Sequence, residues 1–283
     1  MFAEKEVGIL TFEYVCVVVT NKCNLNCNYC YRMNSKLDYM SIDSFEDYAN
    51  KLKQLGGHTI NITGGEPLLN PNWRHFVKYS HEIGLKVILS TNAILLDLDD
   101  PILELIDILV IPLDGSSEAV NSKYRGKGHF TIVSNLIEKY KKGNYHFLLK
   151  INTVMTFDNY CDLTNMIPII SGNNIFWRIF FCKLKGDYNH ISHNDLIIKE
   201  DYIRKVKELY ATLPDSLMYD KCIEDSSLDI TYTLVTSDGM LYVSKGENDI
   251  LIGCMDTLSA EEIYNNTIKK GFSINKHNLC CGI

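Results

Sequence analysis

The strongest constraint on the fold of this chain is a repeated alternation of short apolar runs and amphipathic segments. Six runs rich in β-branched and aromatic residues fit buried strands, at residues 12–20, 58–63, 85–90, 108–113, 145–155 and 175–181. Segments with helical spacing of apolar residues follow at 42–55, 73–83, 101–106, 130–142, from about 158, and at 200–212. This alternation predicts a parallel sheet with right-handed crossovers. Six units favour an α/β fold built as a partial (β/α)6 barrel, with a doubly wound sheet as the alternative.

The alternation stops after residue 213, which predicts a smaller α+β unit at the C-terminus. Apolar runs at 228–236 and 240–244 flank Ser237-Asp238-Gly239, a typical hairpin turn. Ser259 and Glu262 have the spacing of a capping box, which opens an amphipathic helix. We therefore expect a core at 1–213 and an extension with a β-hairpin and a helix at 214–283.

The charge of the chain limits the classes of partner. The formal net charge is −7 and there is no block of Lys or Arg, which argues against nucleic acid or an anionic membrane surface. Glu4 and Glu6 lie where an export signal has a cationic start. The apolar stretch at 102–113 contains Glu104 and Asp107 and is shorter than the roughly 20 residues that cross a bilayer. We expect a cytoplasmic protein whose partners are small molecules or peptides.

Three of the ten cysteines lie together in the polar loop after the first predicted strand. Cys23, Cys27 and Cys30 form a C-x3-C-x2-C pattern. A structural zinc site closes with four ligands, whereas three thiolates on a 4Fe-4S cluster leave one iron open to a substrate or cofactor. Parallel α/β folds place their chemistry at this edge of the sheet. The pattern favours a reactive iron-sulfur site, and the alternatives are a structural zinc or a thiol-disulfide pair.

A second motif, GGEP at residues 64–67, follows the second predicted strand. Together with the cysteine loop it resembles the radical S-adenosylmethionine (radical SAM) superfamily, and an ordered series of matching motifs covers residues 12–182. The resemblance implies that Cys23, Cys27 and Cys30 hold a 4Fe-4S cluster whose open iron binds S-adenosylmethionine. An electron, from an external donor such as flavodoxin or ferredoxin, then cleaves that cofactor to a 5′-deoxyadenosyl radical, which abstracts a hydrogen atom from the substrate.

The resemblance also assigns cofactor contacts near the first two strands. It places Tyr29 near the adenine. By the same resemblance, Pro67 fixes the turn, and the methionine amino group binds to the segment of Gly64, Gly65 and Glu66. Glycines allow close approach of the backbone, and a carboxylate complements an ammonium group. The structural alternatives are a core aromatic residue and an ordinary strand-to-helix turn.

Further positions of the family lie after the third to sixth strands. Thr91 and Asn92 resemble the family's Thr-Asn-Gly, although Ala93 replaces the glycine. Asp114-Gly115 and Arg125-Gly126 resemble the Asp-Gly and Arg-Gly elements of peptide-modifying and molybdopterin-precursor members, which makes Ser116 a candidate for the ribose and Arg125 for the carboxylate of the cofactor. The remaining candidates are Asp114, Asn152 and Arg178. For each of them the alternative is a satisfied structural polar group.

The C-terminal hairpin resembles the entry hairpin of auxiliary-cluster extensions called SPASM or twitch domains. Where those extensions carry a cysteine just after the hairpin, this chain has Ser244. The nearby cysteines are candidate ligands of a second Fe-S cluster, or hydrogen donors in catalysis: Cys222, Cys254, Cys280 and Cys281. Free or substrate-facing thiols are the alternative, and the iron content per chain distinguishes the two.

Other cysteines and histidines predict no chemistry. Cys16, Cys161 and Cys182 lie in predicted strands or a helix, where cysteine is typical of a small core residue. His190 and His193 fall in a polar loop without a nearby cysteine, so we expect a solvated surface.

Two substrate classes are consistent with these motifs. The hairpin with its cysteines and the Asp-Gly and Arg-Gly elements favour modification of a ribosomally made peptide. The short segment before the first strand leaves no room for a separate domain that binds a peptide leader, which favours a metabolite such as a nucleotide, sugar or amino acid. In either case an open cluster and exposed thiolates predict sensitivity to oxygen.

Overall fold

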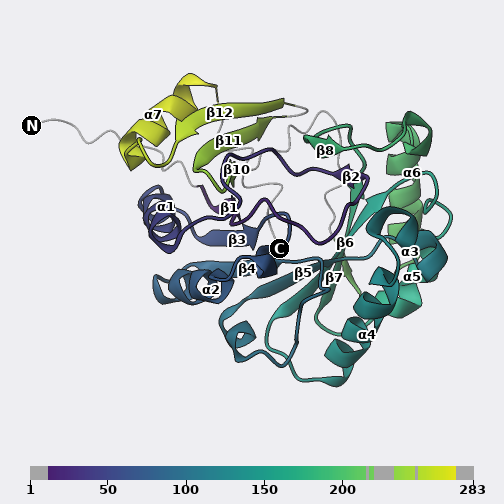
Figure 1. Cartoon of the computed structure of the whole chain (residues 1–283). Coiled ribbons are helices and arrows are strands. Elements are labelled where there is room, and N and C mark those ends of the chain that lie inside the picture. Colours follow the sequence, from purple (N-terminus) through teal and green to yellow (C-terminus); the bar gives the residue numbers. More distant parts are fainter. Residues whose placement is uncertain (1–11, 215–216, 220–232, 246–247, 272–283) are drawn as a thin grey trace, which may run out of the picture.

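Six parallel strands form the centre of the computed structural model, which describes residues 12–214, 217–219, 233–245 and 248–271. Their order in the sheet is their order in the chain. They are β1 (Tyr14–Val18), β3 (Thr59–Thr63), β4 (Lys86–Ser90), β5 (Ile108–Pro112), β6 (Leu148–Met155) and β7 (Ile175–Phe181). Each strand pairs with the next in parallel, for example Ile60 with Val87 and Ile151 with Trp177. The expected α/β fold of partial-barrel type is confirmed (Figure 1).

Helices cover the outer side of the curved sheet (Figure 1). The first two crossovers contain α1 (Ile42–Gln54) and α2 (Trp73–Glu82), and later ones contain α4 (His129–Lys142), α5 (Leu163–Ile170) and α6 (Lys199–Tyr210). Ser41 caps α1, because its side chain accepts a hydrogen bond from the backbone N–H of Ser44. These helices agree with the sequence-based expectation to within a few residues.

Two crossovers differ from the expectation. The segment after β4 is a short 3-10 helix, Pro101–Leu105, instead of an α-helix. The chain returns to the sheet at once, because Asp107 donates its backbone N–H to Val87 O and accepts the Val87 N–H on its carboxylate at 2.7 Å. The crossover after β5 contains an additional helix, α3 (Glu118–Arg125), which the apolar periodicity did not predict.

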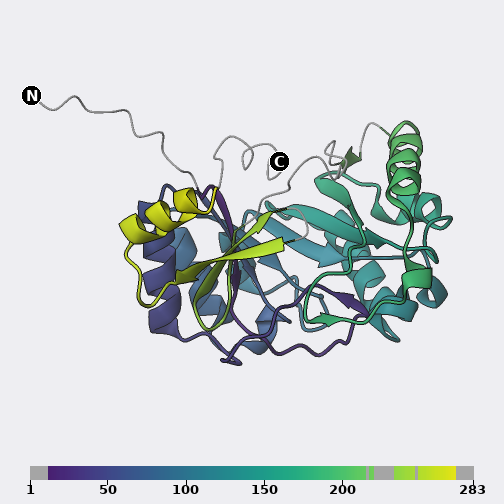
Figure 2. The ribbon, with the colours of Figure 1, turned by 90° about the horizontal axis from the view of Figure 1, so that it is seen from above.

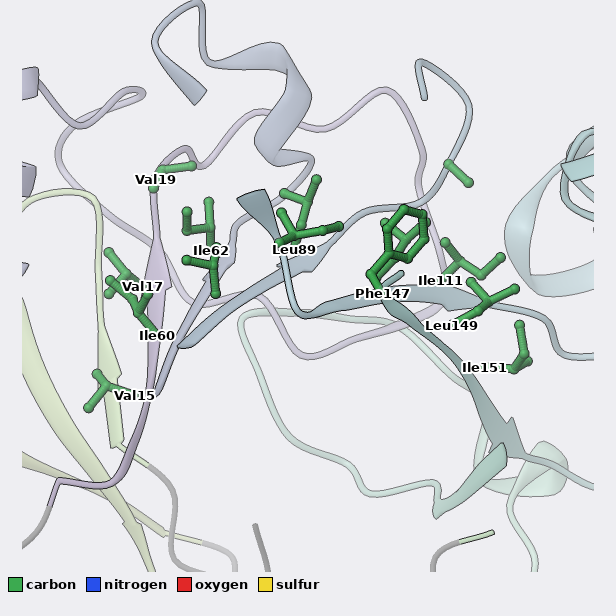
Figure 3. Close-up of a cluster of buried hydrophobic side chains, with 14 of the residues drawn as sticks. Val15, Val17, Val19, Ile60, Ile62, Leu89, Ile111, Phe147, Leu149 and Ile151 are labelled. Atoms are coloured by element: carbon green, nitrogen blue, oxygen red, sulfur yellow. The ribbon is translucent and has the colours of Figure 1, made fainter. Parts of the chain in front are cut away.

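The outward side chains of the strands form the main hydrophobic core (Figure 3). Those labelled in Figure 3 are at most 1% exposed, and burying one such side chain stabilises the fold by about 1.5–3 kcal/mol. The residues labelled in Figure 3 are Val15, Val17, Val19, Ile60, Ile62, Leu89, Ile111, Phe147, Leu149 and Ile151. Burial alternates along β6 with period two, so every second side chain of that strand faces the concave side instead.

The C-terminal strands extend the same sheet beyond β1. β10 (Thr233–Val235) pairs in parallel with β1, and β11 (Met240–Lys245) and β12 (Asn248–Cys254) continue it in antiparallel order. The helix α7 (Ala260–Lys269) begins with the predicted capping box of Ser259 and Glu262 and packs beside α1 (Figure 2). The hairpin and the capping box are thus confirmed, whereas the domain boundary at residue 213 stays a prediction.

Short elements complete the described part of the chain. They are β2 (Tyr29–Cys30), β8 (Tyr188–Asn189), β9 (Met218–Tyr219) and the 3-10 helices Pro67–Leu69 and His193–Asp195. Within the described ranges, no helix has the length and apolar character needed to cross a membrane.

The prediction that three cysteines are core residues is only partly right. Cys182 is buried, but Cys161 is exposed. Cys161 lies in a turn before α5, because this helix begins at Leu163 instead of near residue 158. Cys16 is only partly buried, because it alternates along β1 with the outward core residues. His190 and His193 are exposed, as predicted.

Candidate active site

The loop that carries Cys23, Cys27 and Cys30 leaves the carboxyl end of β1 and is held against the end of β3. The backbone N–H of Gly65 donates to Thr20 O at 2.8 Å, and that of Glu66 donates to Lys22 O at 2.8 Å. A Cβ atom on Gly64 would lie 2.6 Å from Thr20 O, and one on Gly65 would lie 2.3 Å from Lys22 O. The two glycines therefore allow a close approach of backbones that positions the cysteine loop.

Glu66 connects the ends of β3 and β4. Its side chain is fully buried, and its carboxylate accepts hydrogen bonds from Leu68 N at 3.1 Å, Thr91 Oγ1 at 2.7 Å and Asn92 N at 2.7 Å. Burial raises the pKa of this carboxyl above its ordinary value. A carboxylate has about four acceptor sites, so these donors leave about one for an ammonium group. Pro67 starts the 3-10 helix that follows, where its fixed φ suits the turn.

Asn92, just after β4, connects the end of this strand to the cysteine loop by a hydrogen bond. Its side-chain N–H group donates to Asn24 Oδ1 at 2.7 Å and lies 3.9 Å from Cys23 Sγ. Ala93, which stands where the Thr-Asn-Gly motif has glycine, is fully buried and has a φ of 69°. A left-handed backbone costs a non-glycine residue about 1–2 kcal/mol. The turn thus has the conformation that glycine favours, and the Cβ atom of Ala93 makes this backbone conformation strained.

Asp114, just after β5, is fully buried and joins the cysteine loop to α3. Its Oδ2 atom accepts hydrogen bonds from the Tyr29 hydroxyl and from Arg125 Nε, and its Oδ1 atom accepts one from Val154 N at 2.7 Å. The Arg125 guanidinium carbon lies 5.1 Å from the centre of the Tyr29 ring. Burial raises the pKa of Tyr29 well above its ordinary value, so the hydroxyl keeps the proton that it donates. Three residues predicted from separate motifs are thus brought together.

Hydrogen-bond donors face two of the three sulfur atoms. Leu25 N donates to Cys23 Sγ at 3.4 Å, and Arg125 Nη1 donates to Cys27 Sγ at 3.7 Å. Burial raises the pKa of the Cys23 and Cys27 thiols, the effect on Cys27 being opposed by the Arg125 cation. A small apolar cluster surrounds Cys27 and consists of Tyr29, Tyr124, Cys182 and Ile191.

This donor set fits three ligands of an iron-sulfur cluster. Donors to thiolate sulfur and apolar surroundings are typical of Fe-S sites. No three His, Cys, Asp or Glu side chains in the described ranges converge as ligands of a single metal ion. A 4Fe-4S cube takes each cysteine on a different iron, so its ligands do not meet at one point.

Three further candidates lie after β5 and on the last two strands of the barrel. The Ser116 hydroxyl donates to Asp162 Oδ1 at 2.6 Å, and Ser116 N donates to Asp162 Oδ2 at 2.6 Å. Asn152 and Arg178 are direct cross-strand neighbours on β6 and β7. The Oδ1 atom of Asn152 is buried and has no hydrogen-bond partner among the described residues. An unsatisfied buried acceptor is costly, and a bound ligand that donates a hydrogen bond would satisfy it.

The C-terminal candidates are only partly within the described ranges. Cys222, Cys280 and Cys281 lie outside them. Cys254 ends β12, and its sulfur lies 3.8 Å from Asp256 Oδ2. At the position where a cluster-ligating cysteine was expected, the buried Ser244 hydroxyl accepts a hydrogen bond from Lys185 Nζ at 2.8 Å. Lys185 also pairs with Asp249 at 2.9 Å.

Sequence reasoning missed three residues that support Asp114. Asn121 Oδ1 accepts from Asp114 N at 2.9 Å, and Asn159 Nδ2 donates to Asp114 O at 2.9 Å. His129 Nδ1 lies 2.9 Å from Asn121 Nδ2, and burial lowers the pKa of His129 to about 4. Asn121 lies one helical turn before Arg125, but this spacing gave no signal because α3 itself was not predicted.

Comparison with known proteins finds one matching family profile and several related enzymes. The profile of the radical SAM superfamily matches residues 17–167. A GTP 3′,8-cyclase of Synechocystis is 33% identical over 153 residues, which cover 49% of this chain and 44% of that protein. Mycofactocin maturase MftC of Mycobacterium tuberculosis is 27% identical over 169 residues, covering 57% of this chain and 42% of MftC. The chain spans about half the length of the curated relatives that it matches.

Solved structures with a similar fold include two with bound ligands. SuiB of Streptococcus suis bound to S-adenosylmethionine aligns with a TM-score of 0.71 at 14% identity, covering 92% of this chain and 67% of SuiB. The structure described as native anSMEcpe with bound AdoMet and Cp18Cys peptide aligns with a TM-score of 0.71 at 17% identity, covering 93% of this chain and 83% of that chain. At these identities the likeness shows the fold alone.

Proposed function

This chain belongs to the radical SAM superfamily, and we propose that Cys23, Cys27 and Cys30 hold the 4Fe-4S cluster that membership implies. Relatives in this superfamily are enzymes, named as a cyclase, a maturase and a synthase. When bound, the cluster and S-adenosylmethionine supply an electron and a radical that removes a hydrogen atom from a substrate. The work of the chain is to hold these groups and the substrate.

The observation that carries the proposal is the attachment of three strand ends to one cysteine loop. The end of β3 binds the loop through backbone hydrogen bonds of Gly65 and Glu66. The end of β4 binds it through Asn92, and the end of β5 binds it through Asp114. Residues from successive strand ends that meet at one mouth are what a central cofactor site requires.

We assign S-adenosylmethionine to the inner side of this mouth. The buried Oδ1 atom of Asn152 suits a donor on the cofactor, and Arg178 beside it suits an anionic group. Ser116 gives its hydroxyl hydrogen to Asp162, so it would accept a hydrogen bond from a ribose hydroxyl. Glu66 retains about one acceptor site for the methionine ammonium.

The favoured substrate is a ribosomally made peptide. Among the relatives, MftC is named a maturase of mycofactocin, and SuiB has been solved bound to its precursor peptide SuiA. The Asp-Gly and Arg-Gly elements and the C-terminal hairpin support the same class. A metabolite is the second candidate, because the relative with 33% identity is named a GTP 3′,8-cyclase. In both cases we propose a cytoplasmic enzyme reduced by an external donor such as flavodoxin or ferredoxin.

We propose a single cluster. A second one would draw its ligands from Cys222, Cys254, Cys280 and Cys281. At the expected entry position, however, Ser244 is hydrogen-bonded to Lys185, and that lysine is paired with Asp249. A cation held there by a carboxylate supplies no ligand for iron.

The experiment that tests the proposal is anaerobic reconstitution with iron and sulfide, followed by dithionite, S-adenosylmethionine and quantification of 5′-deoxyadenosine. The wild type should be brown and should form deoxyadenosine. Cys27→Ala should lose this product, while Cys161→Ala, at an exposed cysteine outside the loop, should retain it. A colourless wild type that forms no deoxyadenosine would refute the proposal and favour a zinc site or a thiol-disulfide pair in the loop.

The substrate class is tested separately. Co-expression with each short peptide encoded beside the enzyme, followed by mass spectrometry, should reveal a change in peptide mass that the Cys27→Ala variant does not produce. If every such peptide keeps its mass while wild-type enzyme forms deoxyadenosine, the metabolite candidate replaces the peptide.

A further inference from the structure

Arg125 is directed at the cysteine loop by the geometry of α3. Asn121 and Arg125 are four residues apart on this helix, so they lie on one face. Both contact Asp114, Asn121 through the Asp114 backbone N–H at 2.9 Å and Arg125 through the carboxylate. Two contacts one helical turn apart fix the rotation of α3 relative to the end of β5.

The carboxylate that holds Arg125 is itself fixed on all sides. Asp114 is fully buried and accepts hydrogen bonds from Val154 N and the Tyr29 hydroxyl as well as from Arg125. His129 supports Asn121 from behind, with 2.9 Å between His129 Nδ1 and Asn121 Nδ2. The Arg125 side chain is only 13% exposed. Its guanidinium group is therefore held in one place and largely screened from water.

The held guanidinium group reaches a sulfur of the cysteine loop. While Nε is bonded to Asp114, Nη1 donates to Cys27 Sγ at 3.7 Å. The potential of an iron-sulfur cluster depends on hydrogen bonds to its sulfur ligands, on nearby charge and on exposure to solvent. A cation beside a thiolate ligand favours the reduced state, because that state carries one more negative charge.

We propose that Arg125, held by Asp114, raises the reduction potential of the cluster through its contact with Cys27. This role rests on the proposed function, because it requires the cluster. It differs from the expectation that Arg125 binds the cofactor carboxylate, since two of its nitrogen atoms already have partners in the protein. Asp114 acts as the positioning residue.

The test is a redox titration of the reconstituted full-length protein, followed by electron paramagnetic resonance, without S-adenosylmethionine. Arg125→Met should lower the equilibrium constant for one-electron reduction about tenfold, which is a fall in potential of about 59 mV. Arg125→Lys keeps the charge and should recover part of this loss. Arg125→Gln removes the charge but keeps an N–H donor for Asp114, and it should lower the potential in the same direction as Arg125→Met.

Lys123→Met is the matched control. It removes one positive charge from the same helix, but Lys123 pairs with Asp158 and its side chain is 47% exposed. The cluster in Lys123→Met should have the reduction potential of the wild type, because solvent screens an exposed charge.

Each outcome decides the inference. Downward shifts in Arg125→Met and Arg125→Gln with an unchanged control support it. Wild-type potential and iron content in Arg125→Met overturn it. If Arg125→Met binds no iron, Arg125→Gln decides instead, and an unshifted potential there overturns the inference. A wild type that binds no iron refutes the proposed function itself, which is a different result.

Discussion

Ala93 allows the backbone strain in the active-site turn to be measured. It is fully buried and has a φ of 69°, in the region that favours glycine. Ala93→Gly removes a buried methyl group, which lowers the free energy of unfolding by about 0.8 kcal/mol. Glycine also increases the conformational entropy of the unfolded chain, which lowers it further by about 0.4–1 kcal/mol. It also relieves about 1–2 kcal/mol of left-handed strain. These contributions nearly cancel, so we expect the free energy of unfolding to change by less than about 1 kcal/mol.

Ala49→Gly is the matched control for this prediction. Ala49 is 1% exposed and lies inside α1, so the variant loses the same buried methyl group without relieving strain. Glycine inside a helix costs about 1 kcal/mol, which with the methyl group gives a loss of about 2 kcal/mol. Urea unfolding of the full-length variants measures both losses at comparable slopes. Equal losses in the two variants would refute the view that Ala93 is strained.

Three further predictions concern stability and iron. Glu66→Gln places an amide against the donors of Leu68, Thr91 and Asn92, and we expect it to lower the free energy of unfolding by about 1–3 kcal/mol; unchanged thermal unfolding would contradict this. Burial lowers the pKa of His129 to about 4, below the value of about 6.5 in the unfolded chain, so protonation favours unfolding. Stability should fall by up to about 3 kcal/mol as the pH drops from about 6.5 to 4, and urea unfolding should show a weaker decline in His129→Gln; equal declines would argue against it. The reconstituted protein should contain about four iron atoms per chain, because the cysteine loop holds one 4Fe-4S cluster and Ser244 stands where the auxiliary extensions carry a cysteine; a colorimetric iron assay finding about eight would establish a second cluster.

The order of strands and helices could be predicted because burial repeats locally along the chain. Strand β7 begins and ends at the predicted residues, and α1 ends within one residue of its prediction. The cysteine loop and the GGEP turn were also identified, because each is a short motif whose residues are adjacent in sequence. The helix α3 was missed, because its buried face consists of Asn121 and Tyr124 and carries little apolar periodicity.

The amino-acid sequence by itself determined the fold class, the superfamily and the three candidate cluster ligands, since these depend on local periodicity and short spacings. Only the tertiary structure decided the partners of the polar residues. Tyr29 and Asp114 are 85 positions apart, and Lys185 and Ser244 are 59 apart. Neither pair comes from neighbouring strands, because Tyr29 follows β1 and Asp114 follows β5, while Lys185 follows β7 and Ser244 lies on β11. These residues meet through the curvature of the sheet and the paths of its loops, which depend on strand register and on how each crossover packs. For the same reason the sequence placed Arg125 at the site, but only the fold brought it to Cys27.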